Sequence, residues 1–175
     1  GGHLCRLPAY PDSLNRLLNR ASVDLSAGGE AQIKVKQSSF LLQYEDNISL
    51  KNMESTKQID ALRSDISLQQ ATVSDIQLTE LKSKEPQLDV SYTINTTQYG
   101  NRTGKRLFIP ANIFHKSFPT VDNKEKRTQD LQIIYGYQDV DSICIHLPEG
   151  YEIESLPRTS ELKKHFGEFQ SSIKC

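Results

Sequence analysis

The feature that most constrains the fold of this chain is an alternation of apolar and polar residues with a period of two. It appears at Val23–Leu25, resumes at Ala31–Val35, and is clearest at Leu88–Ile94. Such alternation is typical of β-strands that bury one face and expose the other. The Gly28-Gly29 pair between the first two runs predicts a β-hairpin, and we expect its second strand to continue to Tyr44.

One segment departs from this period. Met53, Ile59, Leu62 and Ile66 lie on a single stripe with a period near 3.6, which predicts one helix over residues 50–68. Further strands are expected at the following ranges: 73–81, 131–135, 143–147, 151–156 and 166–173. Many short strands and one helix predict a mostly β chain, an antiparallel β-sandwich with one inserted α-helix (about 50–68).

Length and charge exclude several classes of protein. A chain of 175 residues fits one domain, so residues 21–175 are predicted to form the sandwich and residues 1–20 a linker with one short helical turn. The formal net charge is −1, without the clustered basic excess that nucleic-acid binding requires. We therefore expect no nucleic-acid partner. No apolar run is long enough to span a membrane, so we also expect no membrane span.

Cys144 and His146 are the most tempting catalytic pair, because residues i and i+2 of a strand share a face. A thiol beside an imidazole resembles a nucleophile with its base. Parallel side chains of one strand seldom converge, however, and no third group is evident, so we interpret both as exposed strand residues. Strand alternation then predicts that Ile143, Ile145 and Leu147 are buried.

Two other patterns are weaker. The segment Gly100–Arg106 superficially resembles a phosphate-binding loop, but the spacing of its glycines is wrong and no helix is predicted to follow. We interpret it as the basic tip of a hairpin. The three cysteines, Cys5, Cys144 and Cys175, form neither a disulfide framework nor a zinc motif. The sequence therefore predicts no catalytic, cofactor-binding or metal-binding residue, and no cofactor.

The second half of the chain resembles a known family. Three segments carry the resemblance: Thr103–Pro110 (TGKRLFIP), Leu147–Pro157 (LPEGYEIESLP) and Phe166–Phe169 (FGEF). Together they resemble the uncharacterised C-terminal β domain that follows the transglutaminase-like core in bacterial envelope proteins. The resemblance covers residues 21–175, and Leu147–Pro157 is its most specific part.

The resemblance implies a non-catalytic accessory domain that packs on, or positions, a transglutaminase-like core of the same parent chain. It also implies a periplasmic or cell-surface location, with residues 1–20 as a remnant of that core. The alternative is a glycan- or peptide-binding module at the cell envelope. An exposed apolar patch would favour docking, and a polar groove would favour ligand binding. Exposed strand edges also predict self-association.

Overall fold

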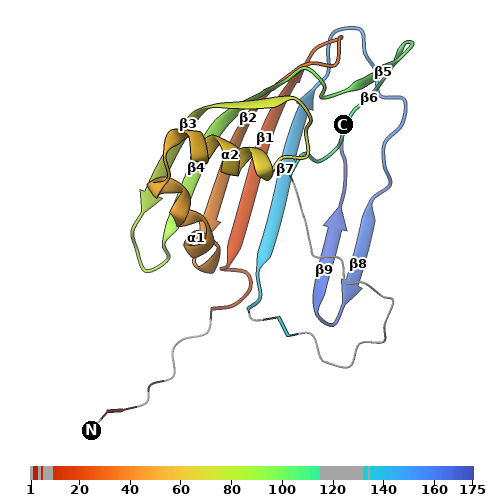
Figure 1. The fold of residues 1–175 in the computed structure, drawn as a ribbon. Coiled ribbons are helices and arrows are strands. Elements are labelled where there is room, and N and C mark those ends of the chain that lie inside the picture. Colours follow the sequence, from red (N-terminus) through yellow and green to blue (C-terminus); the bar gives the residue numbers. More distant parts are fainter. Residues whose placement is uncertain (1, 4, 6–9, 115–131, 134) are drawn as a thin grey trace, which may run out of the picture.

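The structure is a computed structural model that describes residues 2–3, 5, 10–114, 132–133 and 135–175. Its centre is a five-stranded mixed sheet with the strand order β3-β4-β2-β1-β7 (Figure 1). The strands of this sheet are β1 (Arg16–Leu25), β2 (Ala31–Phe40), β3 (Ala71–Leu81), β4 (Gln87–Thr96) and β7 (Gln138–His146). Neighbouring strands are antiparallel except β1 and β7, which are parallel.

The predicted hairpin at Gly28-Gly29 is confirmed as β1 and β2, which pair from Leu25 and Ala31 outward. Its boundaries differ from the prediction at both ends. Residues 16–20, predicted as linker, form the first half of β1. The second strand ends at Phe40 instead of Tyr44, because the backbone leaves the extended conformation at Leu41, which has a positive φ of 52°. The side chain of Leu41 is buried.

The helical segment between β2 and β3 consists of α1 (Leu42–Asn47), the 3₁₀-helix η1 (Ile48–Asn52) and α2 (Ser55–Ser64). The prediction of one helix over residues 50–68 is therefore wrong in its extent. The chain is extended at Met53 and Glu54, with ψ values of 152° and 151°, and this breaks the helix between η1 and α2. Leu62 is buried and Arg63 exposed, as the predicted stripe requires.

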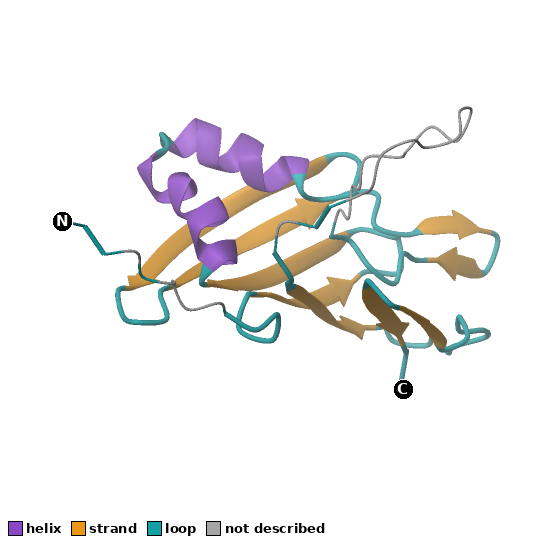
Figure 2. Ribbon diagram, turned by 90° about the horizontal axis from the view of Figure 1, so that it is seen from below, coloured by secondary structure: helices purple, strands orange, loops and turns teal. Residues whose placement is uncertain are grey.

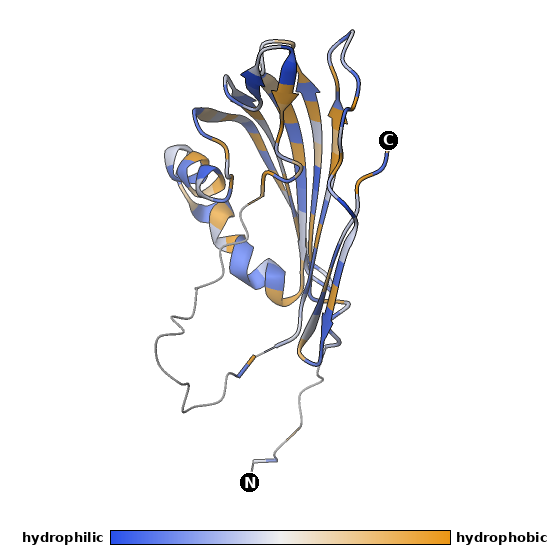
Figure 3. Ribbon diagram, turned by 90° about the vertical axis from the view of Figure 1, so that its right-hand side faces the viewer, coloured by the Kyte–Doolittle hydropathy of each residue, from blue (hydrophilic) through white to orange (hydrophobic). Residues whose placement is uncertain are grey.

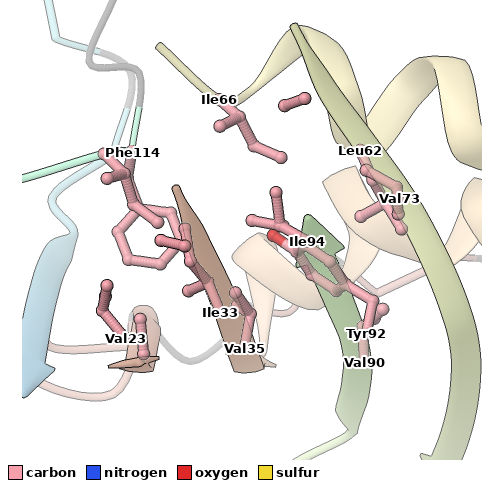
Figure 4. Packing of buried hydrophobic residues seen from close by; sticks show 14 of the residues in the cluster. Val23, Ile33, Val35, Leu62, Ile66, Val73, Val90, Tyr92, Ile94 and Phe114 are labelled. Atoms are coloured by element: carbon pink, nitrogen blue, oxygen red, sulfur yellow. The ribbon is translucent and has the colours of Figure 1, made fainter. Parts of the chain in front are cut away.

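The hydrophobic core lies between one face of the sheet and this helical segment. Both helices lie on the same side of the sheet (Figure 2), and hydrophilic and hydrophobic residues alternate along the strands (Figure 3). Leu62 and Ile66 approach the strand residues Ile33, Val73 and Ile94, all of them buried (Figure 4). Because alternate strand residues point to opposite faces, the remaining strand side chains form a second, polar face, called the open face below.

Two small hairpins complete the described chain. They are β5 (Asn101–Thr103) with β6 (Arg106–Phe108), and β8 (Ser160–Lys164) with β9 (Gly167–Ser171). The sequence predicted β9 but missed β8. The strand predicted at 151–156 does not form. The strand predicted at 131–135 is not found in its described residues, and Leu131 and Ile134 lie outside the described part of the chain.

The prediction of a mostly β fold is confirmed. Its arrangement differs from the expected antiparallel sandwich in two respects. The sheet is mixed, and helices instead of a second large sheet cover its apolar face. Within the part of the chain that the structure describes, no helix has the length and apolar character needed to cross a membrane.

Candidate functional site

Cys144 and His146 lie on the open face of β7, and both are exposed. The Cys144 sulfur is 3.9 Å from Nε2 of His146, and Oγ of Ser22 is 3.3 Å from the same nitrogen. The sequence did not indicate Ser22. Its position depends on the parallel pairing of β1 with β7, in which Ser22 is opposite Cys144.

This geometry brings a thiol, a hydroxyl and an imidazole together, but it does not form a catalytic triad. Among the described residues, the contacts of the imidazole are with Ser22 and Cys144, and no carboxylate or carbonyl accepts a hydrogen bond from it. A triad requires such a third group. The three side chains also stand on an open sheet surface that does not exclude water. What the arrangement offers chemically is an accessible thiol.

We predict that Cys144 reacts readily with a thiol reagent in the folded protein, because its side chain is exposed. Cys5 and Cys175 are also exposed, so the measurement uses the variant with Cys5→Ser and Cys175→Ser. One thiol per chain should react with Ellman's reagent at the same rate with and without denaturant. Reaction only after unfolding would contradict the placement of Cys144 on an open face.

The apolar residues on the other face of β7 are less buried than predicted. Ile143 and Ile145 pack against the core but are only half-buried, and Leu147, which follows the strand, is 38% exposed. The prediction that Ile143 and Ile145 face the core and that Cys144 and His146 face away from it is therefore confirmed, but the prediction that the apolar residues are buried is wrong. The reason is that β7 is an edge strand, so only β1 flanks it within the sheet.

Polar contacts hold the first half of β7 to its neighbours. Asn15 and Asn19 are almost fully buried, and their Nδ2 atoms donate to the Gly136 carbonyl at 3.0 Å and to Oδ1 of Asp141 at 2.9 Å. Asn112 donates to the other oxygen of Asp141 at 2.8 Å. These asparagine and aspartate side chains include no nucleophile, and we infer that their hydrogen bonds attach β7 to the rest of the sheet.

The glycine-containing loop is the tip of the β5–β6 hairpin, as predicted. Gly104 has a φ of 61° and lies at the turn, and Arg106 forms a two-pronged ion pair with Glu154, with N–O distances of 2.7 and 2.8 Å. The strand β6 follows the loop, so no helix N-terminus faces a phosphate. Arg106 instead links this hairpin to the segment after β7.

The displaced pKa values belong to packing contacts away from the Cys144–His146 pair. Hydrogen bonds from Lys51 and Tyr44 lower the pKa of Glu80, which ties the helical segment to β3. Burial raises the pKa of Tyr99 to about 12 and raises that of Tyr92 well above its usual range. The described residues contain no cluster of three or more His, Cys, Asp or Glu side chains that could hold a metal ion.

Exposed apolar side chains gather in the last part of the chain. None of the described residues from 132 to 175 is buried, whereas every buried residue lies at or before Phe114. Seven large apolar side chains after β7 are exposed, and together we call them the apolar C-terminal surface: Leu147, Ile153, Leu156, Leu162, Phe166, Phe169 and Ile173. In the described structure, β8 and β9 pair only with each other (Figure 1).

Residues 105–175 match the model of one protein family, DUF3858, which is described as a domain of unknown function with a solved structure. The chain therefore contains a DUF3858 domain over these residues. No curated protein and no solved structure matches the chain. The match begins inside the β5–β6 hairpin, and its strand β7 pairs with β1, so the central sheet includes residues on both sides of the match boundary.

Proposed function

We propose that this chain is a non-catalytic interaction module that docks on another protein domain through its apolar C-terminal surface. The partner in this proposal is a transglutaminase-like core of the same parent chain. The single observation that supports docking is the group of seven exposed apolar side chains after β7. A concentration of exposed large apolar side chains in one part of a chain is typical of regions that contact another protein.

The β8–β9 hairpin has a distinct apolar side. Leu162 is directly opposite Phe169, and their side chains are 54% and 57% exposed. The other side carries Lys163 opposite Glu168, joined by an ion pair of 3.2 Å. An isolated two-stranded hairpin is marginally stable in water. A partner that covers the Leu162 side would therefore stabilise the hairpin as well as bind it.

The identity of the partner and the location are supported by the resemblance of Leu147–Pro157 and Phe166–Phe169 to the domain that follows transglutaminase-like cores. In this proposal the parent protein is exported to the periplasm or the cell surface. The catalytic residues belong to the core, and the present chain contributes surface only.

The test is a calorimetric titration of the separately produced transglutaminase-like core with this chain. Leu162→Ser combined with Phe169→Ser should weaken binding by about a hundredfold, because apolar anchors at the centre of an interface carry much of its free energy. The matched control is Lys163→Ser combined with Gln170→Ser, on the other side of the same hairpin. This control should leave binding within about threefold of the original, as surface charges contribute little.

Equal losses from both double variants would contradict docking through the Leu162 side. Light scattering at two concentrations identifies a different occupant. If the chain alone dimerises and Leu162→Ser with Phe169→Ser abolishes the dimer, the partner is a second copy, and the proposal of a catalytic core as partner is wrong.

A second candidate function, recognition of a glycan or peptide, is favoured by a different observation. The open face of the sheet is polar and is not covered by the helices (Figures 2 and 3). It contains a shallow hollow of about 360 Å³ between β2, β1 and β7.

A further inference from the structure

Three cations stand side by side at this hollow. Arg20 of β1 is directly opposite Lys36 of β2, and Lys34 is opposite Ser22. Arg20, Lys34 and Lys36 are all exposed, and all three line the hollow with Ser22, Ser142 and Cys144. We call this group of six residues the basic hollow. No carboxylate lines it.

Such an arrangement costs stability in the free protein. Like charges directly opposite each other on neighbouring strands repel, so the Arg20–Lys36 pair destabilises the sheet. Arg20 and Lys34 have no ion-pair partner among the described residues, and Lys36 has one, Asp89, at 3.5 Å. Burial raises the pKa of Asp89, but hydrogen bonds from Ser38 and Gln87 and the charge of Lys36 together outweigh it and lower this pKa.

We propose that the basic hollow binds an extended acidic peptide segment that runs along β2. This inference rests on the second candidate function and is independent of the apolar C-terminal surface. Alternate residues of an extended chain point to one side with a spacing of about 6.6 Å. Acidic side chains at positions i and i+2 of such a segment therefore match Lys34 and Lys36, which are also two residues apart on a strand.

The polar neighbours fit the backbone of the same ligand. Ser142 is opposite Arg20 in the pairing of β1 with β7, and Ser22 follows Arg20 by two residues on the same face of β1. Hydroxyl groups such as these can donate hydrogen bonds to peptide carbonyls. The hollow contains no aromatic side chain, which a sugar ring would stack on. The aromatic residue Phe40 lies at the far end of β2, where the guanidinium of Arg16 covers its ring at 4.7 Å. The two-residue spacing of Lys34 and Lys36 and the absence of an aromatic side chain thus favour an acidic peptide over an anionic glycan.

Fluorescence polarisation of labelled octapeptides tests the proposal on the full chain. The probe alternates Glu and Ser, and the control peptide alternates Gln and Ser. The acidic peptide should bind at low ionic strength and more weakly as salt is added. Arg20→Gln combined with Lys34→Gln should weaken its binding by about tenfold, the expected sum of two exposed ion pairs.

The matched control is Lys57→Gln combined with Arg63→Gln, which removes the same net charge from the exposed side of α2. It should change the affinity by less than about twofold, because it touches no residue of the hollow. Lys57→Gln with Arg63→Gln should keep the unfolding temperature of the original chain, and Arg20→Gln with Lys34→Gln should keep or slightly raise it, because this variant relieves the repulsion between Arg20 and Lys36. Weaker binding without a lower unfolding temperature separates lost binding from lost folding.

Three results would overturn the proposal. The first is equal weakening by both double variants, which would show a response to net charge alone. The second is equal binding of the Gln-Ser peptide, or no binding of the acidic peptide at low salt. The third is that a sulfated oligosaccharide binds at the hollow and the acidic peptide does not, which would identify an anionic glycan as the ligand. Leu162→Ser with Phe169→Ser should leave peptide binding unchanged. The peptide-binding proposal and the docking proposal can therefore be contradicted independently of each other.

Discussion

Ile94→Ala is expected to lower the free energy of unfolding by about 4 kcal/mol, because it removes a fully enclosed side chain from the centre of the sheet. Ile94 lies on β4, with Ile33 of β2 as its pairing partner on one side and Val73 of β3 on the other. Its exposed fraction is 0%, and Leu62 and Ile66 of the same cluster approach it from the helical side (Figure 4). The cavity left by Ala could not be filled without moving both layers.

Two further truncations serve as matched controls for this prediction. Ile145→Ala on the edge strand should cost about 1–2 kcal/mol, since Ile145 is half-buried, and Leu147→Ala should cost less than about 0.5 kcal/mol. Urea unfolding of the three variants, analysed with one common slope of free energy against urea concentration, measures the three changes in the free energy of unfolding. If Ile145→Ala lowers the free energy of unfolding as much as Ile94→Ala does, Ile145 is fully buried in solution, and another part of the protein covers the edge strand β7.

This ranking illustrates how far the sequence predicts the fold. The alternation along Leu88–Ile94 predicts which side of β4 is buried, and the structure confirms it. The same reasoning fails for Ile143 and Ile145, although their alternation is equally regular. A period of two identifies two faces, but it does not tell whether a strand lies at the centre or at the edge of a sheet. That position is set by pairing between distant segments, here β7 with β1.

The candidate sites divide in the same way. Strand periodicity alone places Cys144 and His146 on one exposed face, and the structure bears this out. The role of Ser22 and the basic hollow were not predicted, because they assemble only when β7, which is far from β1 and β2 in the sequence, pairs with β1. Arg20 in particular was assigned to a linker. Once β1 begins at Arg16, Arg20 becomes an exposed strand residue next to Lys36.

The helical segment shows a third kind of limit. The apolar stripe through Ile59 and Leu62 predicts a helix and the side that faces the core, and both are found. The stripe does not predict the break at Met53 and Glu54, because neither residue is a strong helix breaker. Leu50 before the break and Leu62 after it are both buried. We infer that packing of both residues on the sheet, and not local propensity, fixes the bend.

Gly29→Ala should lower the free energy of unfolding by about 3 kcal/mol, which combines the cost of a positive φ in a residue with a side chain and the cost of a direct clash. Gly29 has a φ of 95°, and a Cβ atom there would lie 2.5 Å from the Gly100 carbonyl oxygen. The clashing atom belongs to the backbone and cannot swing away as a side chain would. The carbonyl of Gly29 also accepts hydrogen bonds from the amides of Tyr99 and Gly100, each at 2.9 Å. Any shift that relieves the clash weakens both bonds.

The neighbouring glycine supplies the control for this prediction. Gly28 does not have a positive φ, and a Cβ atom there would meet only the Ser26 hydroxyl, at 3.6 Å. Gly28→Ala should therefore change stability by less than about 0.5 kcal/mol. In thermal unfolding followed by circular dichroism, Gly29→Ala should lower the midpoint by about 10 °C, and Gly28→Ala by no more than about 2 °C. Equal effects of the two substitutions would mean that the turn tolerates a side chain at Gly29. The close approach of Gly29 to the Gly100 backbone would then not fix the conformation of the turn in solution.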